Sequence, residues 1–156
     1  MNATSHVLDR YSAAARRPEA ELCCPVVYDP ELTRILPDEI ISKDYGCGDP
    51  SRYVREGETV LDLGSGGGKI CYMAAQLVGP AGRVIGVDMN DEMLALARRH
   101  QADMAEKIGG DRVSFVKGHI EDLALDVAEL EEHLARSAVR SAADLAALHA
   151  WQDQQR

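Results

Sequence analysis

The sequence predicts an α/β fold in which parallel strands alternate with helices. Three apolar runs have the length of buried strands, at residues 59–63, 83–88 and 112–118. Helical patterns lie between them, at residues 68–79 and 90–110. A strand–helix–strand–helix–strand order with nearly continuous apolar strands is typical of a parallel sheet with crossover helices.

The totals favour one acidic domain with a substantial core. The chain has 156 residues, of which 46% are apolar, and a net charge of −9. No basic cluster exceeds the pair Arg98-Arg99, so a nucleic-acid partner is not expected. No apolar run reaches the roughly 18 residues of a membrane span, and the first residues lack the layout of a signal peptide. We therefore expect a cytoplasmic protein without a membrane partner.

Helices also flank the strand region on both sides. Before it, residues 5–17 suit a short helix, and a second helix is expected within residues 36–46, inside a stretch rich in proline and glycine. The pattern at 90–110 predicts a single helix that Asn90 caps. After Leu123 the chain is expected to be helical to its end, with a Ser141-x-x-Asp144 capping signal.

The glycine-rich turn "DLGSGGGK" at residues 62–69 follows the first strand. A phosphate-binding P-loop is excluded, because Leu63 stands at its first glycine position and Ile70 at its hydroxyl position. A dinucleotide fingerprint matches only in part, because Lys69 replaces its third glycine. Lys69 itself is expected to be a solvated residue of the first helical turn.

The spacing Asp62-x-Gly64-x-Gly66-x-Gly68 resembles motif I of class I S-adenosylmethionine (AdoMet)-dependent methyltransferases. AdoMet carries a sulfonium and an ammonium and no phosphate, so an acid at the strand end suits it. Glycines let a ligand approach the backbone, and Ser65 lies between them. The resemblance implies a Rossmann-like three-layer αβα fold of which this chain holds about three strands.

Two further positions fit the same ligand. Asp88 closes the second strand, and its carboxylate suits the two ribose hydroxyls. Met89 beside it could pack on adenine, and the resemblance implies that Ile120 and Glu121 grip the adenine ring. Simpler roles stay open: Asp62 as a helix cap, Asp88 as a helix N-terminal acid, Met89 as core and Glu121 as a solvated charge.

Three stretches resemble the arsenite methyltransferases within this class: "CCP" from Cys23, "DYGCGDP" from Asp44, and "CYMAAQLVGPAGRVIGVDM" from Cys71. The resemblance covers most of residues 20–125. It implies that Tyr45 contacts AdoMet and that Cys47, with Cys23 or Cys24, binds trivalent arsenic. It also makes Cys71 the counterpart of a family cysteine that can pair oxidatively with an upstream partner.

The implied reaction suits these residues. Thiolates prefer soft centres such as arsenic over hard cations, and no Cys-x-x-Cys pair supports a zinc site instead. Arsenic's lone pair would attack the AdoMet methyl carbon without a general base, so positioning and water exclusion would carry the catalysis. The expected substrate is a small molecule such as an arsenite–thiol adduct. Each cysteine could also be an ordinary buried or surface thiol.

The predicted strands are fewer than the seven that the resemblance implies. The strand at 59–63 would then have an open apolar edge, which invites pairing with another chain. We expect a fragment or half of a split enzyme, completed by a second chain or by self-association, unless residues 125–156 fold over that edge. The expected parts are an N-terminal cap at 1–58, an AdoMet-binding half at 59–124 and a helical segment at 125–156.

Two other functions remain open. The missing strands would also fit an inactive AdoMet-binding or interaction module that needs a second chain. A nicotinamide-dependent oxidoreductase half is a weaker alternative, because of Lys69.

Overall fold

The computed structural model describes residues 10–12, 26–46 and 48–155. Residues 10–12 are helical, and the rest of the predicted helix at 5–17 lies outside the described residues. Cys23, Cys24 and Cys47 also lie outside them, so their predicted roles stay predictions. Among the described residues, no helix is long and apolar enough to cross a membrane.

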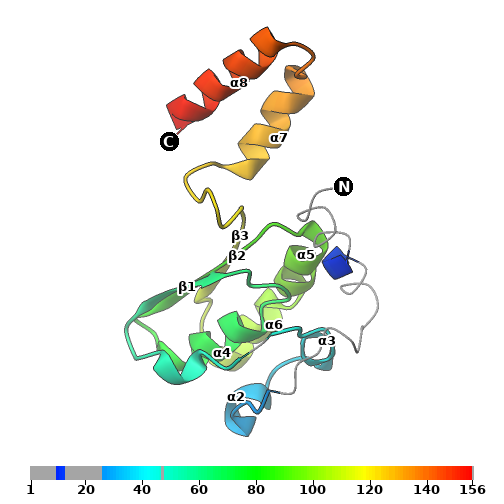
Figure 1. Cartoon of the computed structure of the whole chain (residues 1–156). Helices are drawn as coiled ribbons and strands as arrows, with labels where there is room; N and C mark the ends of the chain where they lie inside the picture. Colours follow the sequence, from blue (N-terminus) through cyan, green and yellow to red (C-terminus); the bar gives the residue numbers. More distant parts are fainter. Residues whose placement is uncertain (1–9, 13–25, 47, 156) are drawn as a thin grey trace.

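One parallel sheet forms the centre of the fold, and its three strands are the predicted ones (Figure 1). They are β1 (Thr59–Leu63), β2 (Arg83–Asp88) and β3 (Val113–Lys117), in the order β1-β2-β3. In register, Leu63 of β1 pairs with Val87 of β2, which pairs with Val116 of β3. The carboxyl ends of all three strands therefore lie at the same end of the sheet, where the predicted site residues are found.

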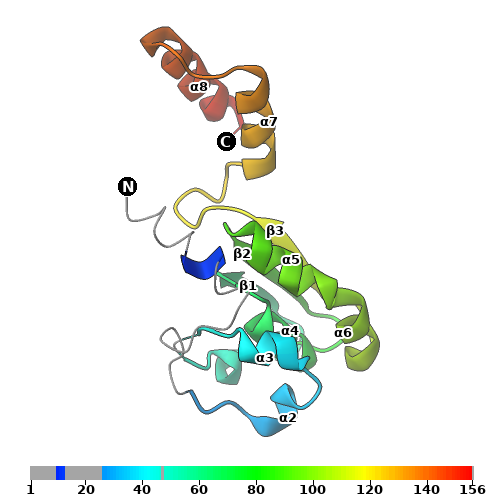
Figure 2. The same cartoon turned by 90° about the vertical axis from the view of Figure 1, so that its right-hand side faces the viewer.

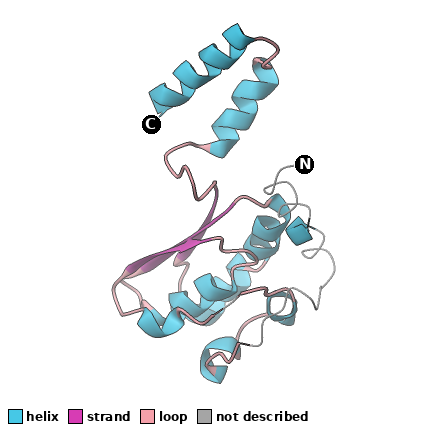
Figure 3. Cartoon of the chain, viewed as in Figure 1, coloured by secondary structure: helices cyan, strands magenta, loops and turns pink. Residues whose placement is uncertain are grey.

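The helices connect and flank the strands (Figure 3). Their bounds are α2 (Pro30–Thr33), α3 (Asp38–Ser42), the 3-10 turn η2 (Ser51–Tyr53), α4 (Lys69–Leu77), α5 (Asp91–Arg99), α6 (Gln101–Ile108), α7 (Val127–Arg136) and α8 (Ala142–Gln155). The prediction of a single helix at 90–110 is wrong, because the helix is interrupted at His100, between α5 and α6. There the backbone N–H bonds back to Ala97 and Arg98, and the imidazole Nε2 lies 2.9 Å from Glu39 Oε2 of α3.

The two faces of the sheet differ. Helices α4, α5 and α6 pack on one face, where Val84, Val113 and Phe115 are buried (Figures 1 and 3). On the other face, Leu61 and Leu63 remain about half exposed. The expectation that the first strand is buried is wrong for the described residues, since none of its five residues is buried. The reason is its place at the edge, with a pairing partner on one side and no helix over its outer face.

Tyr72 lies at the centre of the packed face. Its hydroxyl donates a hydrogen bond to the carbonyl oxygen of Ala97 at 2.7 Å, and its ring meets Phe115 edge-on at 5.6 Å. Burial raises the pKa of the Tyr72 hydroxyl above its ordinary value. This packing joins α4 to α5 and to β3, and so fixes where the turn before α4 lies.

Helices α7 and α8 form a hairpin that stands away from the sheet (Figures 1 and 2). The predicted cap is confirmed: the Asp144 N–H donates to Ser141 Oγ at 3.2 Å. The rings of His133 and Trp151 stack at 4.3 Å between the two helices. The alternative in which residues 125–156 cover the edge of β1 is wrong for the described residues, because this hairpin leaves the far end of β3 and points outward.

Candidate functional site

A cavity of about 490 Å³ opens at the carboxyl ends of the strands. It lies where open α/β sheets usually bind ligands. The cavity brings together nine residues that the sequence singled out: Tyr45, Asp62, Gly64, Ser65, Gly66, Asp88, Met89, Ile120 and Glu121. The three predicted thiol ligands lie outside the described residues, so the structure leaves them untested.

The glycine turn supplies an open stretch of backbone on the cavity wall. Gly64 and Gly66 have φ angles of 77° and 51°, which side chains other than glycine rarely adopt. A Cβ at either position would meet no atom within 4 Å, so the space before this backbone is empty of protein. Gly68 differs, because a Cβ there would come within 2.7 Å of Phe115. The first two glycines therefore expose backbone, while the third allows close packing.

Asp88 is fixed by two backbone amides. Its Oδ2 accepts a hydrogen bond from Gly66 N at 2.8 Å, and its Oδ1 accepts one from Asn90 N at 2.8 Å. Asn90, as predicted, caps α5 by accepting from the N–H groups of Glu92 and Met93. Asp88 thus stands before the cap and ties the glycine turn to the end of β2. Each carboxylate oxygen keeps a further acceptor position.

Asp62 has a different environment. The Cys71 thiol donates a hydrogen bond to Asp62 Oδ2 at 3.2 Å, and Cys71 is fully buried. Burial raises the pKa of Asp62; the thiol hydrogen bond opposes this rise, and the nearby charge of Asp88 adds to it. Burial also raises the pKa of Cys71 well above its ordinary value, so the thiol keeps its proton and remains a donor. Asp62 does not cap α4, because the cap is Gly68 and no side chain bonds there.

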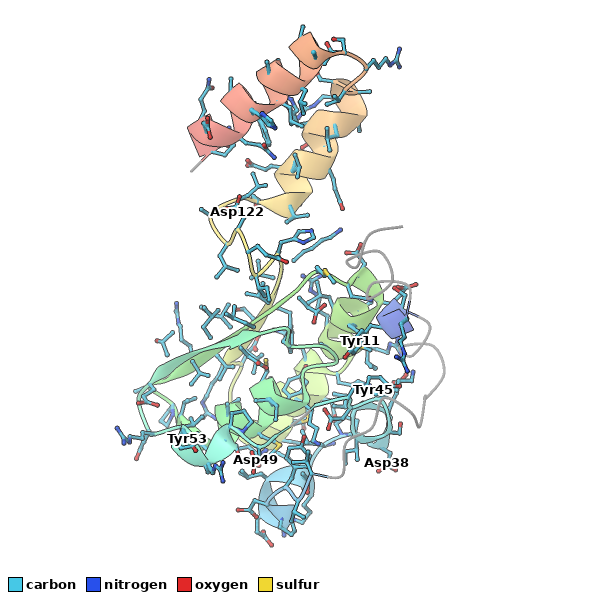
Figure 4. The ribbon with its side chains drawn as sticks, in the orientation of Figure 1. Tyr11, Asp38, Tyr45, Asp49, Tyr53 and Asp122 are labelled. Carbon is cyan, nitrogen blue, oxygen red and sulfur yellow. The ribbon has the colours of Figure 1, made fainter. Side chains whose placement is uncertain are left out.

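The apolar wall of the cavity comes from three separate segments, at Tyr45, Met89 and Ile120. Tyr45 is buried, packs with Met93 and meets Tyr11 edge-on at 6.0 Å (Figure 4). Met89 is half-buried on the cavity wall and is not part of the core. Ile120 also lines the cavity, and its side chain is 57% exposed, so it is accessible to a ligand.

Lys69 contradicts its prediction. Instead of being solvated, its side chain is 6% exposed, and its Nζ lies 2.5 Å from Asp44 Oδ2. The ammonium also lies 3.0 Å from the centre of the Tyr28 ring. Sequence reasoning missed this pair because Asp44 lies 25 residues earlier; the one available signal was its place in "DYGCG".

The cavity has a negative balance of charge. Among the described residues, two basic side chains line the cavity, Lys69 and Lys43. The Lys43 ammonium pairs with Glu39 Oε1 at 2.9 Å. The acids on the wall are Asp44, Asp62, Asp88 and Glu121. This balance favours a cationic ligand and disfavours phosphates. The described residues hold no group of three or more histidine, cysteine or acidic side chains placed to bind a metal ion.

Comparisons with known proteins identify the family of this chain. A family described as "Methyltransferase domain" matches residues 55–146, which is more than half of the chain. An arsenite methyltransferase of Aquipseudomonas alcaligenes is 47% identical over 107 residues, covering 65% of this chain and 31% of that protein. The human arsenite methyltransferase is 37% identical over 105 residues, covering 66% of this chain and 28% of that protein.

A solved structure points the same way. The arsenic(III) S-adenosylmethionine methyltransferase of Chlamydomonas reinhardtii matches with a TM-score of 0.56 and 39% identity, over 62% of this chain and 34% of that one. The chain spans less than a third of the length of the curated relatives named above. The predicted likeness to class I methyltransferases near the arsenite group is confirmed. The chain belongs to the methyltransferase domain family.

Proposed function

We propose that this chain forms the AdoMet-binding part of a methyltransferase. One observation carries the proposal: Asp62 and Asp88 lie at the carboxyl ends of neighbouring strands, on a cavity that the left-handed turn at Gly64 and Gly66 also lines. Two carboxylates beside exposed backbone suit a ligand with a cationic end and a ribose. The residues present therefore fit AdoMet.

The geometry supports one role for each of these residues. Asp88 receives the ribose hydroxyls, and because two amides already fix its oxygens it needs no reordering on binding. Asp62 offsets the positive charge of the methionyl end. Tyr45 packs on the same end, while Met89 and Ile120 hold the adenine from two sides. Glu121 and the backbone at Ile120 supply the hydrogen bonds to its polar edge.

We propose that the methyl acceptor is trivalent arsenic held by the thiolates of Cys47 and of Cys23 or Cys24. AdoMet would supply a methyl group bound to a positively charged sulfur. The arsenic lone pair would form a bond to the methyl carbon as the carbon–sulfur bond breaks, and the electron pair of that bond would stay on sulfur. No proton moves in this step, so the protein's part is to position the acceptor and exclude water.

Titration calorimetry tests the binding proposal. AdoMet should give saturable heat with the folded chain, whereas ATP and reduced nicotinamide cofactor should give none. Asp88→Asn should weaken AdoMet binding by about tenfold or more, since it removes a charged acceptor. Asp103→Asn, an acid of α6 away from the cavity, is the matched control and should bind as wild type. Absence of heat with AdoMet and with its demethylated product would refute the proposal.

A turnover assay separates an enzyme from a binding module. The chain is mixed with arsenite, AdoMet and a thiol reductant, and arsenic species are separated and counted. Methylated arsenic establishes the enzyme reading. AdoMet binding without product would instead support the module that needs another chain.

We also propose that a further strand, from a second chain or a second copy, pairs with β1. The place of β1 at the end of the strand order supports it, because among the described residues β1 pairs only with β2 and its outer backbone edge is open. If the partner is a second copy, light scattering after size exclusion should show self-association. If it is another polypeptide, co-expression with a chain that carries further strands should give a complex. We further propose that the chain is divided into an N-terminal cap at 1–58, an AdoMet-binding half at 59–124 and a helical segment at 125–156. We also propose that the protein is cytoplasmic.

A further inference from the structure

Three side chains beside the cavity have no part in the roles proposed above. They are Tyr28 before α2, Asp44 after α3, and Lys69 at the start of α4, and we call them the Tyr28–Asp44–Lys69 cluster. The cluster joins two N-terminal segments to the helix that follows the glycine turn. Lys69 and Asp44 are both largely buried, with side-chain exposures of 6% and 17%.

The Asp44 carboxylate is the centre of the cluster. Its Oδ2 accepts hydrogen bonds from Lys69 Nζ and from the Tyr28 hydroxyl at 3.1 Å, and its Oδ1 accepts one from Gly46 N at 3.2 Å. The Tyr28 hydroxyl also lies 3.4 Å from the carbonyl oxygen of Gly48. The cluster thus fixes the backbone at Gly46 and at Gly48, the two neighbours of position 47. A buried, charge-assisted arrangement of this kind has a narrow preferred geometry.

The same cluster controls the charge of the cavity. Lys69 lines the cavity, where an uncompensated ammonium would repel a cationic ligand. Its pairing with Asp44 removes that repulsion and leaves Asp62 and Asp88 as the acids nearest the glycine turn. Lys69, whose sequence position resembles that of the P-loop lysine, therefore pairs with Asp44 and is not available to bind a phosphate.

We infer that Lys69 is a positioning residue: through Asp44 it holds Tyr45 and the chain on both sides of Cys47 against the cofactor turn. This inference rests on the proposed function for the roles of Tyr45 and Cys47. The Lys69–Asp44 pair thus couples the backbone position at Gly46 and Gly48 to the turn where the cofactor binds. A ligand that tightens the turn would then also tighten that segment.

Hydrogen–deuterium exchange of the ligand-free chain tests the inference. Lys69→Met should speed exchange of a peptide covering residues 43–49 by about tenfold, the scale of one charged hydrogen bond, while β2 keeps its protection. Lys117→Met is the matched control. Lys117 is also a largely buried lysine, between Asp91 and Glu131, but it lies outside the cavity, so its loss should leave residues 43–49 unchanged.

A double variant separates positioning from a stranded charge. Lys69→Met leaves Asp44 buried without its counterion, which alone could loosen the segment. In Asp44→Asn with Lys69→Met, neither charge remains. Exchange at residues 43–49 that stays fast supports the inference, and exchange that returns to the wild-type rate overturns it. If Lys69→Met fails to fold, the double variant, which leaves no unpaired charge, takes its place, and wild-type exchange at residues 43–49 in that variant overturns the inference.

Calorimetry distinguishes this inference from the proposed function. If wild type binds AdoMet, Lys69→Met should weaken binding by about tenfold, and equal affinity would contradict the link to the cofactor. If wild type does not bind AdoMet, the proposed function fails, while the exchange comparison still decides whether Lys69 holds the segment.

Discussion

The two faces of the sheet show what positions the cavity in this chain. On the face under α4 to α6, Val84 is fully buried and Phe115 is 7% exposed, whereas on the opposite face Leu61 is 50% and Val116 48% exposed. Both faces carry similar apolar residues, so composition does not explain the difference. The packed face holds the glycine turn and α4 in place, whereas among the described strand residues of the other face only Val87, on the central strand, is buried. Substitutions on the two faces should therefore differ greatly in cost.

Phe115→Ala should have the largest effect. Phe115 packs against Tyr72 and lies under Gly68 and Gly86, so its removal leaves a cavity below the glycine turn. Truncation of a buried phenylalanine costs about 3–5 kcal/mol of unfolding free energy. Urea denaturation followed by circular dichroism measures this. A cost below about 1 kcal/mol would mean that this face is not the one that stabilises the fold.

Tyr72→Phe should have an intermediate effect. It removes only the hydroxyl that donates to Ala97, and leaves a buried carbonyl without this partner. The expected loss of unfolding free energy is about 1–3 kcal/mol. The same urea experiment tests it, and an unchanged midpoint would show that the bond between α4 and α5 contributes nothing.

The pH dependence of stability should show a smaller effect, at the contact between α3 and the helix break. Hydrogen bonds from Lys43 and His100 lower the pKa of Glu39 to about 2, from an ordinary value of 4.5. A carboxylate with a lowered pKa stabilises the folded state above pH 4.5, and this contribution is lost as the pH falls towards 2. Urea midpoints at pH 7, 4.5 and 3 should therefore converge between wild type and Glu39→Gln as the pH falls.

Glu31→Gln is the control for that series. Glu31 forms an exposed pair with Arg34 on α2, so the variant should follow the wild-type curve at every pH. A gap between wild type and Glu39→Gln that is as large at pH 3 as at pH 7 would contradict the assignment to Glu39.

Leu61→Thr should have the smallest effect in this chain. Threonine is β-branched and therefore suits a strand, and the leucine that it replaces is already half exposed. The change in unfolding free energy should stay within about 0.5 kcal/mol. A cost of several kcal/mol would show that the outer face is covered in solution, for example by a second copy, and light scattering would then test that partner.

Local signals predicted much of the fold. The strands and the cap at Asn90 depend on residues within a few positions of one another, and so does the turn at Gly64 and Gly66. The break at His100 was missed because its ring bonds to Glu39, 61 residues earlier. A period-based prediction does not detect such a contact.

The candidate site shows the same limit. The spacing of Asp62, Gly64, Gly66 and Asp88 predicted that they serve one ligand, and the structure places all four on one cavity. It did not predict the thiol bond from Cys71, nor the burial of Lys69, because both depend on how α4 packs. Charged side chains with distant partners are the residues for which a sequence pattern says least.

The most direct test of the central claim is an AdoMet titration followed by amide nuclear magnetic resonance. Signals from Gly64 to Gly66, from Asp88 to Asn90 and from Gly118 to Glu121 should shift together with one dissociation constant. Signals of the outer sheet face, at Leu61 and Val116, should stay unchanged. Shifts confined to other regions, or none at saturating AdoMet, would contradict the assignment of this cavity to AdoMet.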